Sequence, residues 1–104
     1  NVIQMNMLTI TTDNEDALNK VYNTAVGDRT TIKDVATQLR KQLSKFDAKI
    51  KEVEIVNGPI RKGDVPHSLA SIDKAKKLLD YKPTHEFNEG LKEAVDWYWN
   101  NLNK

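Results

Sequence analysis

Four consecutive residues, Arg61, Lys62, Gly63 and Asp64, bring together groups that can hold a pyrophosphate and a sugar diol. The forked guanidinium of arginine binds phosphate oxygens in pairs, glycine lets the backbone approach a ligand closely, and an ionised carboxylate accepts hydrogen bonds from hydroxyl groups. The alternative interpretation is a solvated turn with a satisfied aspartate, because charged loops that contain glycine are common. The four residues by themselves leave both interpretations open.

The spacing of the glycines tests for nucleotide-binding loops. The glycines are Gly27, Gly58, Gly63 and Gly90, so the G-x-G-x-x-G run of a dinucleotide-binding fold is excluded within this sequence. Gly58 and Gly63 have the spacing of a P-loop, but Asp64 follows where that motif requires a lysine. A carboxylate at that place would repel phosphate, so we expect no P-loop.

Other catalytic signatures are absent from the sequence as well. It has no cysteine, and His67 and His85 lie far apart without paired carboxylates at ligand spacing, so we expect no metal site. No tyrosine is followed four positions later by a lysine, so no tyrosine base with a lysine one helical turn away is available. We therefore expect no catalytic residue within these 104 residues.

Length and composition narrow the class of protein. The 104 residues suffice for one small domain, and 38% hydrophobic residues predict a lean core. The net charge of +1, with both signs interspersed, argues against nucleic acid or an anionic membrane as a partner. The absence of cysteine suits a cytoplasmic location. The sequence opens on Asn1 without an initiator methionine or a signal-peptide layout, and we expect it to be part of something longer.

Hydrophobic periodicity and turn residues predict four helices and two strands. The expected helices cover 1–11, 31–46, 71–80 and 87–102, and the expected strands cover 21–26 and 50–56. The fold class that follows is α/β (α+β), with helices packed on a short two-stranded sheet. Residues 60–70 form a loop in this prediction, so Arg61 and Asp64 lie on it.

Two details of the helices are predicted more sharply. Thr31 and Asp34 have the spacing of a capping box, in which each side chain bonds the other residue's backbone N–H. In the last helix Trp97 and Trp99 are about 200° apart on the helical wheel. One of these two tryptophans must therefore face away from the helix's packed side.

Four stretches together resemble a known family. They are VYNTAVGDRTT at 21–31, RKGDVPHS at 61–68, KLLDYKP at 77–83, and Gly90-Leu91 with Asp96-Trp97-Tyr98. Their order and spacing resemble the C-terminal third of the NAD-dependent epimerase/dehydratase family, the extended short-chain dehydrogenases. Within it, VGDRTT and the GDVPHSLA run are most similar to bacterial UDP-N-acetylglucosamine 4-epimerases. The resemblance implies one unit, residues 1–104, that forms the nucleotide-sugar-binding lobe without the Rossmann domain.

The resemblance also implies roles for individual residues. Arg61 corresponds to the arginine that clamps the UDP diphosphate, and Asp64 to the acid that accepts from a ribose hydroxyl. Arg29 matches an arginine near bound substrate, although a structural arginine in a turn before a helix fits the sequence as well. Ser68 leaves room beside the hexose C2 for an acetamido group. His67 is either a substrate contact or a structural histidine, and Tyr22 is implied to support the pocket from below.

The implied function is the UDP-sugar-binding part of a nucleotide-sugar 4-epimerase. The substrates would be UDP-GlcNAc and UDP-GalNAc, or UDP-glucose and UDP-galactose, and the isolated chain is expected to be inactive. The resemblance implies NAD as the cofactor of the longer protein, held by its N-terminal Rossmann domain, and a homodimeric parent. Two alternatives stay open: a dehydratase or decarboxylase of the same family, and an α/β interaction module without chemistry.

Overall fold

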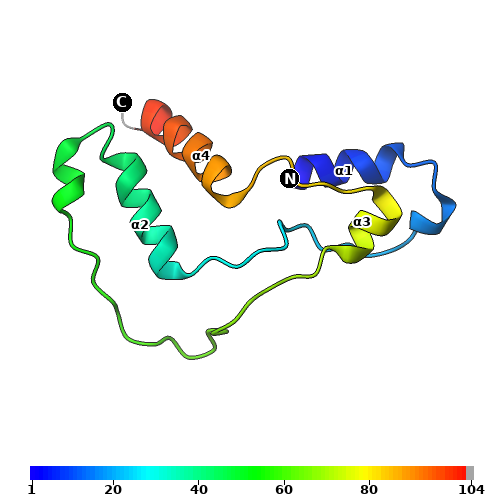
Figure 1. The fold of residues 1–104 in the computed structure, drawn as a ribbon, viewed down its shortest axis with the longest axis horizontal. Helices are drawn as coiled ribbons and strands as arrows, with labels where there is room; N and C mark the ends of the chain where they lie inside the picture. The colour runs from blue at the N-terminus through cyan, green and yellow to red at the C-terminus, as the bar shows by residue number, and fades with distance from the viewer. Residues whose placement is uncertain (103–104) are drawn as a thin grey trace. The chain divides into compact units, whose positions relative to one another are not determined.

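The computed structural model describes residues 1–102 and contains six helical elements (Figure 1). Four are α-helices and two are short 3-10 helices: α1 (Val2–Thr11), η1 (Glu15–Ala17), α2 (Ile32–Leu43), η2 (Ala48–Glu52), α3 (Asp73–Leu79) and α4 (Phe87–Leu102). All four predicted α-helices are therefore confirmed. The second predicted helix ends at Leu43, short of Phe46, and the third begins two residues after Ser71.

The predicted two-stranded sheet is wrong, because no residue between 1 and 102 is in a strand. Residues 21–26 have no regular structure, and η2 occupies the start of the expected second strand. A strand needs a neighbour that satisfies its backbone groups. The two segments belong to different compact units of the chain, and side chains of their own units bond several of their carbonyls instead. The fold is all helical over the described residues.

The chain divides into two compact units, each built from two separate stretches of sequence. Over the described residues, the first unit contains 1–29 and 67–86, and the second contains 30–66 and 87–102. The first carries α1, η1 and α3, and the second carries α2, η2 and α4.

The core of the first unit forms around Tyr81. The buried members of this core are Met5, Ala17, Ile72, Ala75, Leu79 and Tyr81. Tyr81 is fully buried, and its hydroxyl donates to the carbonyl of Ala25 at 2.8 Å. Burial also raises the pKa of the Tyr81 phenol, so the neutral hydroxyl is the form that donates. One side chain thus ties the segment after α3 to residues 21–26.

Other side chains hold the same segment along α3. Lys74 donates to the carbonyl of Val21 at 3.0 Å, and Asn23 donates to the carbonyl of Ser71 at 3.0 Å. The Lys74 ammonium also lies 5.4 Å from the centre of the Tyr22 ring. These side-chain hydrogen bonds take the place of the backbone hydrogen bonds between strands. They fix the path of residues 21–25 although residues 1–102 form no sheet.

Asn1 fixes the start of α1 inside the first unit. Its side-chain amide donates to the carbonyl of His85 at 2.7 Å and accepts from the His85 N–H at 3.2 Å. Gln4, one turn later, donates to the carbonyl of Lys82 at 2.6 Å. The first turn of α1 is therefore held against 82–85.

The second unit has a sparser core. The capping box predicted for α2 is confirmed: Thr31 Oγ1 accepts from the Asp34 N–H at 3.0 Å, and the Asp34 carboxylate accepts from the Thr31 N–H. These hydrogen bonds lower the pKa of Asp34, with the Thr31 side chain as the main cause. α2 contacts both η2 and α4 (Figure 1). Val95 is the buried apolar side chain of this unit among the described residues.

In the second unit, an aromatic contact joins the segment after α2 to α4. Phe46 stacks on Trp99 with ring centres 5.0 Å apart. Trp97 is 57% exposed and meets Tyr98 edge to face, so the prediction that one tryptophan faces outward is confirmed.

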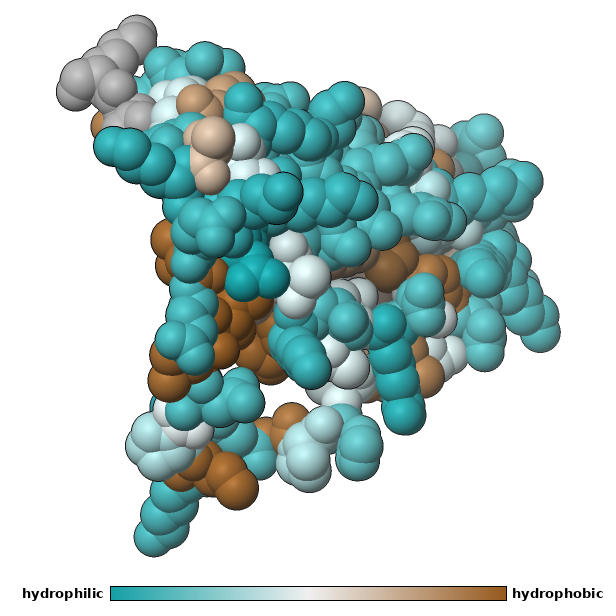
Figure 2. All heavy atoms as spheres, turned by 60° about the vertical axis from the view of Figure 1, so that its left-hand side comes forward, coloured by the Kyte–Doolittle hydropathy of each residue, from teal (hydrophilic) through white to brown (hydrophobic). Residues whose placement is uncertain are grey.

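Apolar side chains also remain exposed on both units, and Figure 2 shows them between hydrophilic groups on the face it presents. In α1, Met5 is buried while Ile3, Met7 and Ile10 are exposed. Within the described residues, the helix therefore packs only one part of its wide apolar surface. No helix in this part of the chain is long and apolar enough to cross a membrane.

The role of Tyr81 gives a stability prediction. Tyr81→Phe keeps the ring but leaves the Ala25 carbonyl without its donor, so we expect the free energy of unfolding to fall by about 1–2 kcal/mol. Chemical denaturation followed by circular dichroism measures the change. Tyr98→Phe is the matched control, because the Tyr98 side chain is exposed and water can bond its hydroxyl. Equal losses in both variants would contradict this account of the core.

Candidate functional site

Arg61 and Asp64 form a paired, solvent-accessible turn in the second unit. Arg61 Nε lies 3.3 Å from Asp64 Oδ2, and the Asp64 N–H donates to the Arg61 carbonyl at 3.2 Å. Gly63 makes the turn possible because its φ of 92° lies in the region that side chains disfavour. The two side chains are 83% and 53% exposed. The predicted pair therefore shares one turn, and a ligand can reach both groups.

The contact between Arg61 and Asp64 leaves hydrogen-bonding groups of both side chains free for a ligand. The contact uses Nε of Arg61 and one carboxylate oxygen of Asp64. The terminal fork of the guanidinium has no hydrogen-bond partner within residues 1–102, and it is the edge that binds two phosphate oxygens at once. The other oxygen of Asp64 is equally available to accept from a hydroxyl. A surface ion pair of this kind contributes little to stability because solvent screens it, so it costs little to rearrange around a ligand.

Arg29 and Ser68 lie in the first unit, on segments that the unit brings close together. Arg29 is exposed, and its N–H donates to Oδ1 of Asp28 at 2.7 Å. Gly27 directly before them has a φ of 78° and lies over Ile72, where an added Cβ would come within 3.2 Å of the isoleucine side chain. A side chain at position 27 would be strained on both counts. The VGD turn therefore sits on the segment that follows Ser68.

A shallow cavity of about 290 Å³ opens where these two segments meet. It is lined by Gly27, Leu69, Ala70, Ser71, Ile72, Asp73 and Lys76. Ser68 immediately precedes the lining residues and is exposed, as is His67. The first unit thus offers a hollow beside two of the predicted site residues.

Tyr22 is more buried than the other predicted site residues of the first unit, which are exposed. It is half-buried against the core, and its hydroxyl donates to the carbonyl of Ala17 at 2.6 Å. That bond and the nearby Lys74 ammonium account for the ring's position. A supporting role beneath a pocket is compatible with this placement and stays a prediction.

The predicted site residues fall into two groups. Arg61 and Asp64 belong to the second unit, whereas Tyr22, Arg29, His67 and Ser68 belong to the first. Sequence reasoning missed two residues that shape the first group. Tyr81 is fully buried and bonds the Ala25 carbonyl, a long-range partner that the sequence does not signal. Ile72 sets the need for glycine at position 27 through a contact that is also distant in sequence.

The described residues contain no group of three or more His, Cys, Asp or Glu side chains that could hold a metal ion. The glycines with positive φ, Gly27 and Gly63, lie in separate turns rather than in a dinucleotide-binding run. The absence of a bound dinucleotide cofactor from this chain stays a prediction, and the groups that the predicted site residues offer are guanidinium, carboxylate and hydroxyl groups.

Comparison with known proteins finds relatives that include several UDP-glucuronate 4-epimerases, although no protein-family model matches the chain. UDP-glucuronate 4-epimerase 4 of Arabidopsis thaliana is 34% identical over 79 residues, which cover 76% of this chain and 17% of that protein. UDP-glucuronate 4-epimerase of Thermodesulfobacterium geofontis is 46% identical over 41 residues, covering 39% of the chain and 13% of the relative. A probable UDP-glucuronate 4-epimerase of Rhizobium meliloti is 37% identical over 46 residues, or 44% of the chain and 14% of the relative.

The chain thus spans less than a fifth of the length of these relatives. The finer resemblance, to UDP-N-acetylglucosamine 4-epimerases, stays a prediction. The resemblance to nucleotide-sugar epimerases is supported: this chain has homologues among UDP-glucuronate 4-epimerases and is similar to a short part of each.

Proposed function

We propose that this chain is a UDP-sugar-binding part of a nucleotide-sugar 4-epimerase. The observation that carries the proposal is the exposed Arg61–Asp64 pair on the Gly63 turn. The pair offers a free guanidinium fork for a diphosphate and a free carboxylate oxygen for a ribose hydroxyl, within reach of each other. The similarity to UDP-glucuronate 4-epimerases supports the same ligand class from an independent direction.

The role proposed for this segment is positioning. A diphosphate held at Arg61 would act as a fixed point, while the hexose beyond it stays free to present either face to the reacting groups. Those groups, and the NAD that the family resemblance implies, would be supplied by the remainder of a longer protein. That remainder would also cover the exposed side of α1, where Ile3, Met7 and Ile10 lack partners within the described residues.

The sugar itself has two candidates, each favoured by a different observation. Ser68 is small and exposed, which leaves room for the acetamido group of UDP-GlcNAc. The relatives are UDP-glucuronate 4-epimerases, which favours a hexose that carries a C6 carboxylate. We favour UDP-GlcNAc and UDP-GalNAc on the steric argument, with UDP-glucuronate as the second candidate.

The diphosphate site can be tested on the chain itself. We expect UDP to shift the backbone amide signals of 61–68 in a saturable NMR titration, and Arg61→Ala to weaken that binding by about tenfold or more, because a charge-assisted bidentate contact is lost. Lys62→Ala is the matched control, since it removes an adjacent positive charge without the fork. Equal weakening by both variants would mean that charge alone attracts the nucleotide, and Arg61 would lose its assigned role.

The two sugars can be separated in the longer enzyme that contains this segment. Ser68→Tyr is expected to lower kcat/KM for UDP-GlcNAc by at least about tenfold, because the ring fills the space proposed for the acetamido group. Ser68→Ala keeps the space and should leave the value unchanged. Turnover of UDP-GlcNAc that is unaffected by tyrosine, or a wild-type enzyme that turns over only UDP-glucuronate, would refute the steric assignment.

A further inference from the structure

A second concentration of positive charge lies in the second unit, away in sequence from the Arg61 turn. A cavity of about 290 Å³ is lined by Thr37, Arg40, Lys41, Ser44 and Lys51. We call these five residues the α2 basic recess. Three of the five carry a positive charge, two carry a hydroxyl group, and none carries a carboxylate.

The elements explain why these five residues meet. Thr37, Arg40, Lys41 and Ser44 follow one another at steps of three and one along α2, so they share one side of the helix. Lys51 comes from η2, which packs against α2. The recess therefore joins side chains from two elements.

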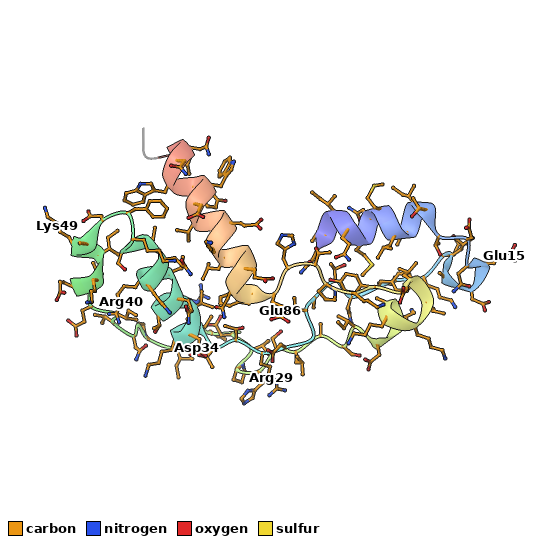
Figure 3. The ribbon with its side chains drawn as sticks, turned by 45° about the horizontal axis from the view of Figure 1, so that its top comes forward. Glu15, Arg29, Asp34, Arg40, Lys49 and Glu86 are labelled. Carbon is orange, nitrogen blue, oxygen red and sulfur yellow. The ribbon has the colours of Figure 1, made fainter. Side chains whose placement is uncertain are left out.

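Arg40 is held in place more firmly than an ordinary surface arginine. It is half-buried, and its Nη1 donates to the carbonyl of Val53 at 2.9 Å, just beyond the end of η2 (Figure 3). Within residues 1–102 the Arg40 guanidinium makes this one hydrogen bond, so its other N–H groups are available to a ligand. A guanidinium fixed by one bond loses less conformational entropy when it binds a ligand.

Carboxylates do not neutralise the recess. Within residues 1–102 none of the five recess residues forms an ion pair with a carboxylate, whereas Arg61 pairs with Asp64 and Lys82 with Asp80. Asp34, the acid on α2, is engaged with Thr31 in the capping box. Three like charges thus line one hollow, and an anion placed there would relieve their repulsion.

The simplest alternative is that the cations serve the helix. Positive side chains near a helix C-terminus interact favourably with the helix dipole, which accounts for Arg40 and Lys41 in the last turns of α2. It does not account for Lys51, which another element brings to the same cavity.

We propose that the α2 basic recess binds a phosphate group, separately from the diphosphate site at Arg61. A guanidinium and two ammonium groups match the several acceptor oxygens of phosphate. The hydroxyls of Thr37 and Ser44 line the cavity but donate to the carbonyls of Lys33 and Lys41, so the three cations carry the binding. The cavity is open enough to admit the rest of a molecule that carries the phosphate. The recess differs from the Arg61 turn because no carboxylate from residues 1–102 lines it, so its ligand does not need a sugar hydroxyl to bind.

The test uses the 104-residue chain with inorganic phosphate and pyrophosphate as probes, at constant ionic strength. We expect saturable shifts of the backbone amides of 37–44 and of Lys51, with pyrophosphate binding more tightly than phosphate. The double variant Lys41→Gln with Lys51→Gln should weaken pyrophosphate binding by about tenfold, because two of the three charges are lost. Shifts that do not saturate, or that spread evenly over all lysines, would overturn the proposal.

The matched control is the double variant Lys45→Gln with Lys49→Gln. It removes the same total charge from the neighbouring parts of the chain, yet neither residue lines the recess. Lys49 lies on η2, as Figure 3 labels it, and Lys45 follows α2. We expect the control to keep nearly full affinity, and equal weakening in both double variants would refute a specific site. Arg40→Lys, which keeps the charge but removes the fork, should also weaken binding, and circular dichroism checks that each variant remains folded.

The recess and the Arg61 site can fail independently. Arg61→Ala should leave the pyrophosphate response of 37–44 intact, and the recess double variant should leave the UDP response of 61–68 intact. A recess response that disappears with Arg61→Ala would overturn the separate site without touching the proposed nucleotide role. Loss of the 61–68 response alone would remove the nucleotide role and leave the recess standing.

Discussion

The hydrogen bond from the Tyr81 hydroxyl to the Ala25 carbonyl holds together the part of the first unit that positions its candidate site residues. Burying an aromatic ring is favourable, but a buried phenol without a partner would offset much of that gain. The Ala25 carbonyl satisfies it, and the bond in turn satisfies a backbone oxygen that no sheet supplies. The course of 21–26 follows from this bond, and the course of 21–26 sets where Gly27, Asp28 and Arg29 lie.

Gly27 shows how that constraint reaches the site. The segment runs so close to Ile72 that a Cβ at position 27 would press on its side chain. The close approach brings Gly27 into the lining of the shallow hollow, together with residues 69–73. The course of the backbone leading to Arg29 and of the backbone following Ser68 is thus set by packing between Tyr81, Ile72 and residues 25–27. Changes in this core would therefore shift both segments without altering Arg29 or Ser68 themselves.

Local features of the fold were predictable from sequence, and non-local ones were not. The Thr31–Asp34 capping box was predictable because its residues are three apart and its chemistry is self-contained, and the loop that carries Arg61 and Asp64 was predicted as well. The two strands were wrong because apolar runs with β-branched residues only make a strand when another segment completes the ladder. In this structure side chains take over that task for 21–26, and a 3-10 helix forms at 48–52. Tyr81 and Lys51 were missed because their partners lie on distant elements that periodicity cannot pair.

Charge pairing within the second unit separates two ways of binding phosphate. At the turn, Asp64 neutralises Arg61 in advance, so a bare anion would have to compete with a carboxylate that is already in place. A ligand with both a diphosphate and a ribose hydroxyl would replace the ion pair with two new contacts, diphosphate to guanidinium and hydroxyl to carboxylate. The pair itself therefore favours a nucleotide over a bare anion. The α2 basic recess has no carboxylate in its lining, so a phosphate placed there would meet three cations without competing against a built-in acid. With a net charge of +1 over the whole chain, the difference between the two sites arises from which cations have an acid beside them, rather than from the total charge.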